Sequence, residues 1–166
     1  MVKLEDLVSS FEASAPPSVG EQGIASFEKT AGFELPGPLR AILLEHDGGN
    51  LEPNYAVRFP SSDFAGGFGN APIGQIFGIA RDPWQTIRPL RDHFADMEAQ
   101  VANVPTEIFV FADDWGGNVA TFDARNGEIG FVDHETCGED FSDPETYYVV
   151  AANFDDLLTR LSAAET

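Results

Sequence analysis

The sequence predicts an α+β fold with N-terminal helices packed on a mostly antiparallel sheet and a closing C-terminal helix. Apolar residues recur at helical spacing from Leu4 to Leu43, and short apolar runs of strand length dominate from Pro105 onward. The last segment returns to helical spacing. Helices, then strands, then a helix is an order typical of α+β proteins, whereas regular alternation of strands and helices would indicate a doubly wound parallel sheet.

The N-terminal segment begins with a short amphipathic helix. Its apolar face is formed at positions i, i+3, i+4 and i+7 by Leu4, Leu7, Val8 and Phe11. The stretch 13–20 contains two adjacent prolines and a glycine, so it is predicted to be a linker. We therefore divide the chain into residues 1–20, a helix with its linker, and residues 21–166, a single domain.

Two further helices precede the sheet. The first covers about 21–31, and Gly32 supplies the left-handed residue that ends many helices. The second opens at Leu35-Pro36 and ends at Asp47-Gly48-Gly49. The core-facing positions of the two helices are Ile24, Phe27, Ala31, Leu39, Ile42 and Leu43.

The middle of the chain changes to strands and returns once to a helix. Alternation at 55–59 predicts a strand, the Gly-rich stretch 65–70 predicts a mobile loop, and 73–79 predicts another strand. Pro89 is suited to the first turn of a helix, because its missing N–H would be unpaired there anyway. The apolar stripe of this helix is Leu90, Phe94, Met97 and Val101.

The C-terminal part is predicted to be sheet until its last helix. Apolar runs at 107–112, 119–122 and 129–132 predict three strands, and Asn126-Gly127 between the last two indicates a hairpin. A further strand is expected at 147–151. The final helix has Asn153 as its N-cap and the apolar face Phe154, Leu157, Leu158 and Leu161.

Composition excludes several classes of protein. The chain has 166 residues, of which 43% are apolar, enough for one hydrophobic core. It carries 28 acidic and 9 basic residues, a formal net charge of −19. Such a charge argues against nucleic acid and anionic membranes as partners and favours basic proteins or cations. We expect a cytoplasmic protein, because the N-terminus resembles no signal peptide and no apolar run reaches the length of a membrane helix.

Catalytic motifs are largely missing. The sequence has no G-x-S-x-G, no P-loop lysine and no H-E-x-x-H, and the glycines at 66–70 lack dinucleotide-binding spacing. The best candidate for metal or acid–base chemistry is the set Asp113, Asp114, Asp133, His134 and Glu135. Because aspartates at strand ends commonly form turns, we favour a structural role for this set and assign no catalytic residue, metal or cofactor.

The single cysteine, Cys137, excludes an internal disulfide and lies three residues from His134. A thiol beside an imidazole can form a nucleophile pair. Here the surrounding acids are expected to raise the thiol pKa, which favours an inert cysteine.

Acidic residues are concentrated in the second half of the chain. Between Ala95 and Thr159 there are fifteen, opposed by Arg125 alone, and six of them lie in 133–145. This concentration indicates either a solvated face, including adaptation to high salt, or a surface that attracts a basic protein. The candidate partner-binding residues are Asp113, Asp114, Trp115, Asp133, Glu135, Glu139, Asp140, Asp143 and Glu145. For Trp115 we favour packing over a sheet edge, with an exposed binding anchor as the alternative.

Several short motifs occur in an order that resembles the SUKH superfamily. The N-terminal ones are Ile24-x-x-Phe27-Glu28, Gly32-x-x-Leu35-Pro36 and Leu43-Leu44-x-x-Asp47-Gly48-Gly49. The later ones are the runs 76–79 and 108–118, Gly127-x-Ile129-x-Phe131-x-Asp133-His134-Glu135, and Phe154-x-x-Leu157-Leu158. The resemblance covers about 21–161. It has Asp47 where the family pattern usually has Asn, and both residue types tolerate a left-handed backbone.

The resemblance implies an α+β fold without known enzymatic activity. It further implies a bacterial immunity protein that binds and blocks a toxin domain, often a nuclease, while fungal members of the superfamily act as cell-wall signalling scaffolds. Members vary the surface that meets each partner, so no partner-binding residue can be carried over. We therefore expect an immunity protein for a basic toxin. The alternatives are a regulator or scaffold without a toxin, and a metal-dependent hydrolase that uses the Asp113 to Glu135 set.

Overall fold

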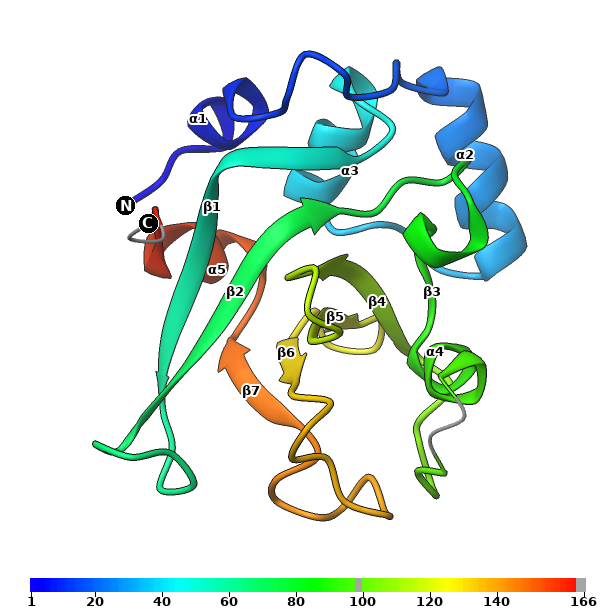
Figure 1. The fold of residues 1–166 in the computed structure, drawn as a ribbon. Helices are drawn as coiled ribbons and strands as arrows, with labels where there is room; N and C mark the ends of the chain where they lie inside the picture. The colour runs from blue at the N-terminus through cyan, green and yellow to red at the C-terminus, as the bar shows by residue number, and fades with distance from the viewer. Residues whose placement is uncertain (98–99, 164–166) are drawn as a thin grey trace.

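The computed structural model describes residues 1–97 and 100–163, and it confirms the α+β prediction (Figure 1). The helices are α1 (Leu4–Ser9), α2 (Gly20–Ala31), α3 (Gly37–Glu45), α4 (Leu90–Asp96) and α5 (Phe154–Arg160), with a 3₁₀ turn at Pro83–Gln85. The strands are β1 (Gly49–Pro60), β2 (Phe68–Ile76), β3 (Arg88–Pro89), β4 (Ile108–Asp113), β5 (Val119–Asp123), β6 (Ile129–Val132), β7 (Tyr148–Ala151) and β8 (Leu161–Ala163).

The strands form one sheet in the order β7-β6-β5-β4-β2-β1-β8, with β3 paired to β4, and every pairing is antiparallel. Figure 1 shows α1, α2 and α3 gathered at the top of the view, while the segment that follows β6 extends to the bottom. The buried apolar side chains form one cluster that includes Leu7 of α1, Ile24 of α2 and Phe154 of α5. In the described part of the chain, no helix is long and apolar enough to cross a membrane.

The predicted helix ends are confirmed at two positions. Gly32 follows α2 with φ 81°, a left-handed conformation that costs glycine little. Asn153 caps α5, because its side chain accepts a hydrogen bond from the Asp156 amide at 2.9 Å. The last helix ends one residue earlier than predicted, at Arg160. Leu161 instead begins β8, which pairs with Tyr55–Val57 of β1, and a buried leucine fits either element.

The hairpin of β1 and β2 is longer than predicted, and the mobile loop expected at 65–70 is correspondingly shorter. Phe68, Gly69 and Asn70 belong to β2 and pair with the end of β1. A Cβ on Gly69 would lie 2.4 Å from Cζ of Phe59, so the missing side chain lets that ring cross the strand. The glycine that favoured a loop is therefore a packing position within the sheet.

The strand predicted at 73–79 ends at Ile76, because the next residues turn to meet Asp47. The buried Asp47 carboxylate accepts hydrogen bonds from the amides of Ile79 at 2.7 Å and Ala80 at 3.0 Å. The left-handed backbone belongs to Gly48, at φ 72°, and not to Asp47. The tolerance for a left-handed backbone that aspartate shares with asparagine is therefore not used at this position. Its side chain joins the end of α3 to the segment after β2.

Helix α4 ends at Asp96, so the predicted helical stripe does not reach Val101. Residues 98–99, which the prediction also included, lie outside the described residues. Leu90 and Phe94 are buried as expected, and His93 is buried with them at 7% exposure.

Candidate protein-binding surface

The candidate residues lie in two segments that the structure joins. One is the turn between β4 and β5, residues 114–118, and the other is the segment 133–146 between β6 and β7, which we call the acidic loop. Strand β5 separates β4 from β6 in the sheet. The two segments nevertheless meet, because Oδ1 of Asn118 accepts the backbone amide of His134 at 3.1 Å and lies 2.9 Å from its Nδ1.

The turn after β4 is built by the carboxylate of Asp114. Its Oδ1 accepts the amides of Gly116 at 2.7 Å and Asn118 at 3.1 Å, and its Oδ2 accepts Nδ2 of Asn118 at 2.7 Å. These bonds accompany a left-handed backbone at Trp115, with φ 69°. A non-glycine residue in this region carries backbone strain, which the surrounding hydrogen bonds hold in place.

The indole of Trp115 both packs and remains exposed. A Cβ on Gly74 of β2 would lie 2.6 Å from Cδ1 of Trp115, so the ring covers the sheet at that glycine. The side chain is still 54% exposed. The packing that we favoured from the sequence is present, and half of the residue faces solvent as the alternative required.

Asp113, at the end of β4, differs from its neighbour Asp114. Burial raises the pKa of Asp113 to about 6, and the charge of Asp114 raises it further, while a hydrogen bond from the Trp115 backbone opposes the shift. Its Oδ1 is buried and has no hydrogen-bond partner. Asp113 therefore carries an incompletely compensated carboxylate directly beside the Trp115 turn.

In the acidic loop, the aspartates bind backbone amides of the loop itself, and the glutamates are exposed. Asp133 accepts the Glu135 amide at 3.0 Å, Asp140 accepts the Ser142 amide at 2.9 Å, and Asp143 accepts the Asp140 amide at 3.0 Å. Each of these carboxylates belongs to a half-buried residue. The exposed acids of the loop are Glu135, Glu139 and Glu145. Half of the six predicted partner-binding acids of this loop thus build its fold.

Further contacts fix the acidic loop to the rest of the protein. The fully buried Thr146 hydroxyl donates to the Asp140 carbonyl at 3.0 Å and accepts the Gly138 amide at 2.9 Å. Outside the loop, Ala102 donates its amide to the Glu139 carbonyl at 2.8 Å and accepts the Phe141 amide at 2.9 Å. The exposed glutamates are consequently carried by an ordered frame.

The metal-site alternative is not assembled by the fold. Within residues 1–97 and 100–163, no group of three or more His, Cys, Asp or Glu side chains is placed to hold a metal ion. Asp114 and Asp133 bind amides of their own turns, and Nδ1 of His134 lies against Asn118. The five side chains that we considered for a hydrolase do not form a cation site.

Cys137 and His134 do not form a nucleophile pair. The Cys137 thiol donates to the backbone carbonyl of His134 at 3.6 Å rather than to its imidazole. Burial raises the pKa of the thiol, and the charge of Asp133 adds to this effect. The predicted direction is confirmed, with burial as the larger cause, and the thiol stays protonated at neutral pH.

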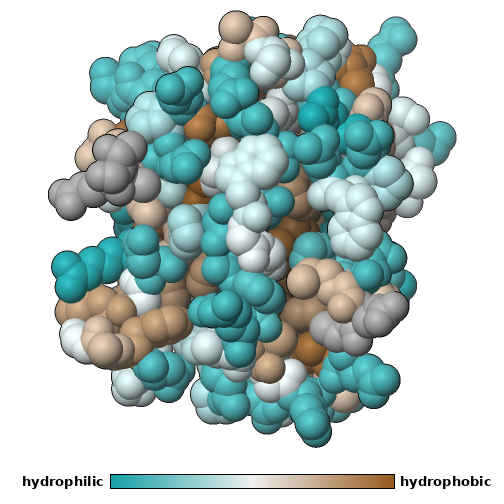
Figure 2. All heavy atoms as spheres, in the orientation of Figure 1, coloured by the Kyte–Doolittle hydropathy of each residue, from teal (hydrophilic) through white to brown (hydrophobic). Residues whose placement is uncertain are grey.

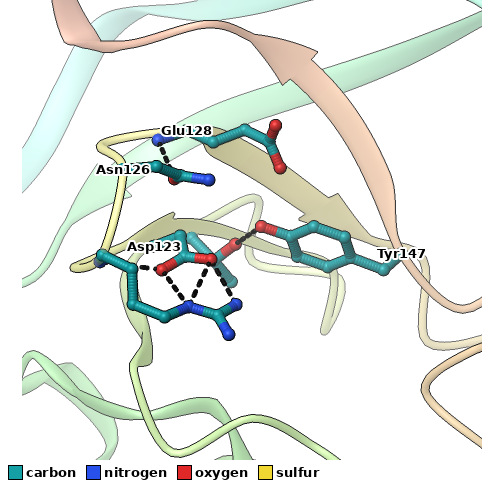
Figure 3. A network of polar contacts seen from close by, with 6 residues as sticks. Asp123, Asn126, Glu128 and Tyr147 are labelled. Atoms are coloured by element: carbon teal, nitrogen blue, oxygen red, sulfur yellow. Dashed lines mark hydrogen bonds and ion pairs between the residues drawn. The ribbon is translucent and has the colours of Figure 1, made fainter.

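A network that the sequence did not reveal neutralises Arg125, the one Lys or Arg between Ala95 and Thr159 (Figure 3). Asp123 is buried, and its two oxygens accept Nε of Arg125 at 2.9 Å and Nη2 at 2.6 Å. The Arg125 side chain lowers the pKa of Asp123. The spacing Asp-x-Arg ahead of Asn-Gly was the available signal for this pair. Because Arg125 is committed to Asp123, it offers no compensation to the exposed glutamates.

The same network fixes Tyr147, which precedes β7. Its hydroxyl accepts a hydrogen bond from Thr121 at 3.2 Å (Figure 3). Burial raises the pKa of Tyr147 to about 12. A Cβ on Gly130 would lie 2.1 Å from the ring, so this glycine is the platform on which Tyr147 rests. The C-terminal end of the acidic loop is thereby seated on β6.

The model of the SMI1 / KNR4 family (SUKH-1) matches residues 19–160. The chain belongs to this family. Comparison with curated proteins gives no match. The match confirms the resemblance found in the motifs. The matched residues include all helices and strands of this chain from α2 to the end of α5, and the Trp115 turn and the acidic loop lie among them.

Proposed function

We propose that this SUKH-1 chain is an immunity protein that binds and neutralises a basic toxin domain, of the nuclease class. The family is known for immunity proteins in toxin systems and is generally non-catalytic. The observation that carries the proposal is an exposed tryptophan in a strained, hydrogen-bonded turn that is tied to an ordered acidic loop. Trp115 and the exposed Glu135, Glu139 and Glu145 are the proposed contacts, with Asp113 beside them.

Charge supports a basic partner. The chain carries a formal net charge of −19, and hydrophilic residues cover most of the face seen in Figure 2. A nuclease requires a basic surface to bind phosphates. Carboxylates facing such a surface accelerate association and make it sensitive to salt. They also occupy the positions that nucleic acid would take, which would block the toxin directly.

The geometry of Trp115 supports a role as an anchor. Tryptophan is enriched among the few residues that dominate binding energy at protein interfaces. The ring already packs on Gly74, and the rest of the side chain faces solvent. Because the ring is ordered before binding, little conformational freedom is lost when a partner covers it. A strained backbone is retained at sites where geometry serves binding.

The first test is affinity capture of the tagged protein from its own cells with washes at low and high salt. We expect one basic toxin-like protein that is lost from the complex as the salt concentration rises and whose toxic activity returns when it is separated from this chain. Recovery of no basic protein, or of a partner indifferent to salt, would contradict the proposal and favour a regulator or scaffold.

The second test compares the two tryptophans of the chain in binding to the captured protein. Trp115→Ala is expected to weaken binding by roughly 30-fold or more, as at other central anchors. Trp84→Ala is the matched control, because Trp84 is also 54% exposed but lies in the 3₁₀ turn. Equal effects of the two substitutions would remove Trp115 from the interface.

A charge test separates the acidic loop from net charge. Replacing Glu135, Glu139 and Glu145 together by lysine is expected to lower the association rate at least tenfold at low salt. The matched control replaces Glu34, Glu45 and Glu52, which are also exposed and have no ion-pair partner among the described residues. Both variants change net charge equally, so similar rates would show that the acidic loop has no special part.

A further inference from the structure

Strand β2 has a partner strand on one side along its length but on the other side only at one end. It pairs with β1 throughout, apart from one irregularity, and with β4 only at Gln75 and Ile76. Strand β4 leaves β2 at Asp113, because the turn 114–118 reverses the chain into β5, and Figure 1 shows β2 and β4 diverging from there. Within the described ranges, no strand pairs with the outer side of residues 68–72, which we call the free edge.

The pairing with β1 determines which backbone groups face the free edge. Pro72 lies opposite a residue of β1 but has no N–H, so the hydrogen bonds that hold this pair come from the residues on either side of it. The amide of Ser61 donates to the carbonyl of Gly67 at 3.1 Å, which continues the same alternation. The odd-numbered residues of β2 therefore bond to β1. Phe68, Asn70 and Pro72 direct their backbone groups away from it.

These outward groups are available to another chain. The N–H groups of Phe68 and Asn70, and the carbonyls of these residues and of Pro72, have no hydrogen-bond partner in the described part of the chain. Phe68 is 46% exposed and Asn70 is also exposed, so this part of the hairpin faces water. A row of unpaired N–H and C=O groups is a template on which a further strand can form.

The free edge has little protection of its own. Proteins usually guard such edges with charged side chains, prolines or bulges. Residues 68–72 include no charged residue, and Pro72 is the one proline. The net charge of −19 provides a different protection, because two copies of the chain repel each other. The same charge attracts a basic segment, so the edge is closed to a second copy and open to a basic partner.

We propose that an extended segment of the basic toxin domain adds to the free edge as a further strand. In strand addition, backbone hydrogen bonds supply affinity and side chains at alternate positions supply specificity. The added strand would take the place beside β2 that β4 leaves at Asp113. Its end would lie close to Trp115, whose ring packs on Gly74 of β2. This inference rests on the proposed function and states how the surface around Trp115 engages its partner.

The test is amide hydrogen exchange, followed residue by residue by NMR on the full ¹⁵N-labelled chain, alone and bound to the captured protein. In the free chain, the amides of Gly69 and Ala71 bond to β1 and should exchange at least about tenfold more slowly than those of Phe68 and Asn70. In the complex, exchange at Phe68 and Asn70 should slow at least about tenfold, because both amides gain acceptors. Equal rates at all four residues in the free chain would overturn the proposal.

The exchange measurement also separates this inference from the proposed function. A complex that is weakened by Trp115→Ala, yet leaves exchange at Phe68 and Asn70 unchanged, would overturn strand addition alone. If no basic protein binds the chain, both the proposed function and the added strand are overturned.

Proline substitutions at two edges of the sheet give a second measurement. Asn70→Pro removes an outward N–H without removing a bond to β1, so Kd for the captured protein should rise at least about tenfold. The matched control is Ala163→Pro in β8, at the far edge of the sheet. Ala56 bonds to Ser162, so the amide of Ala163 also points outward.

The control should change Kd by less than about twofold, because β8 lies away from the free edge. Equal losses of affinity for the two proline variants would overturn the proposal. If Asn70→Pro does not fold, the exchange rates of the wild-type chain in the complex still decide it.

Discussion

The two ends of the sheet use carboxylates in different ways. At the helical end, acids are matched: Asp47 binds two backbone amides, and Glu21 and Glu28 both pair with Arg40. At the end that carries the acidic loop, Glu135, Glu139 and Glu145 form no ion pair among the described residues, and Arg125, which pairs with Asp123, lies in the hairpin at the opposite end of β5 and β6. The difference follows from side-chain length as well as from composition. Aspartate reaches the amide two residues ahead and forms turns, whereas glutamate extends past it to solvent.

Removal of the Asp47 carboxylate is expected to have the largest effect on stability. Asp47→Ala leaves the buried amides of Ile79 and Ala80 without acceptors, so we expect the free energy of unfolding to fall by about 3 kcal/mol. Asp47→Asn keeps one acceptor oxygen and should cost about half as much. Urea unfolding measures both. A loss below about 0.5 kcal/mol for the alanine variant would show that the joint between α3 and the segment after β2 is not held by this side chain.

Asp113, next to the Trp115 turn, is a half-buried carboxylate without a full set of partners, and it makes stability depend on pH. Its carboxyl titrates near 3.8 when unfolded and about 6 when folded, so the folded state holds the proton more tightly. The stability it contributes is fully present below about pH 4 and is lost as the pH rises through 6. Partial exposure reduces the effect to about 1–2 kcal/mol.

The Asp113→Asn variant should remove this loss. In unfolding measurements between pH 4 and 7, the difference in stability between the variant and the wild type is therefore expected to grow in favour of asparagine. Asp123, whose pKa is lowered by Arg125, changes stability only at more acidic pH and in the opposite direction. A difference that stays constant over this range would mean that the Asp113 carboxyl does not titrate there.

Asp140 and Glu139 are neighbours in the acidic loop, and alanine substitutions at the two positions should differ in their effect on stability. Asp140→Ala removes the acceptor for the Ser142 amide and is expected to lower stability measurably in thermal or urea unfolding. Glu139→Ala should change stability by less than about 0.5 kcal/mol, because its side chain is exposed and unpaired. Binding to the captured partner should show the reverse order. Equal stability effects would end the distinction between aspartates that build the loop and glutamates that cover it.

Much of the fold could be predicted from local signals. The helix ends at Gly32 and Asn153 and the hairpin at Asn126-Gly127 depend on turn and cap chemistry that acts within a few residues. The errors arose where distant residues decide the outcome. Gly69 signals a loop until Phe59 is known to cross it, and Leu161 fits a helix until β1 is known to lie beside it.

The candidate surface was predicted in composition but not in arrangement. The sequence showed that acids gather in 133–145, yet it did not show which carboxylates bind amides. The exposure of Trp115 depends on Gly74, and the loss of Arg125 as a counter-charge depends on the burial of Asp123. The contact of Trp115 with Gly74 joins separate strands, so periodicity along the chain carries little information about it, whereas the Asp123–Arg125 pair is local and its signal was the Asp-x-Arg spacing.

The amide-binding aspartates of the acidic loop also bear on how such a protein diversifies. Asp133, Asp140 and Asp143 form a scaffold whose geometry does not involve the outward side chains. Substitutions at the three exposed glutamates can therefore accumulate with little loss of folding, and each one alters the pattern of charge offered to a partner. When the partner protein changes during evolution, a few substitutions at these glutamates can change the binding specificity while the fold of the acidic loop stays the same.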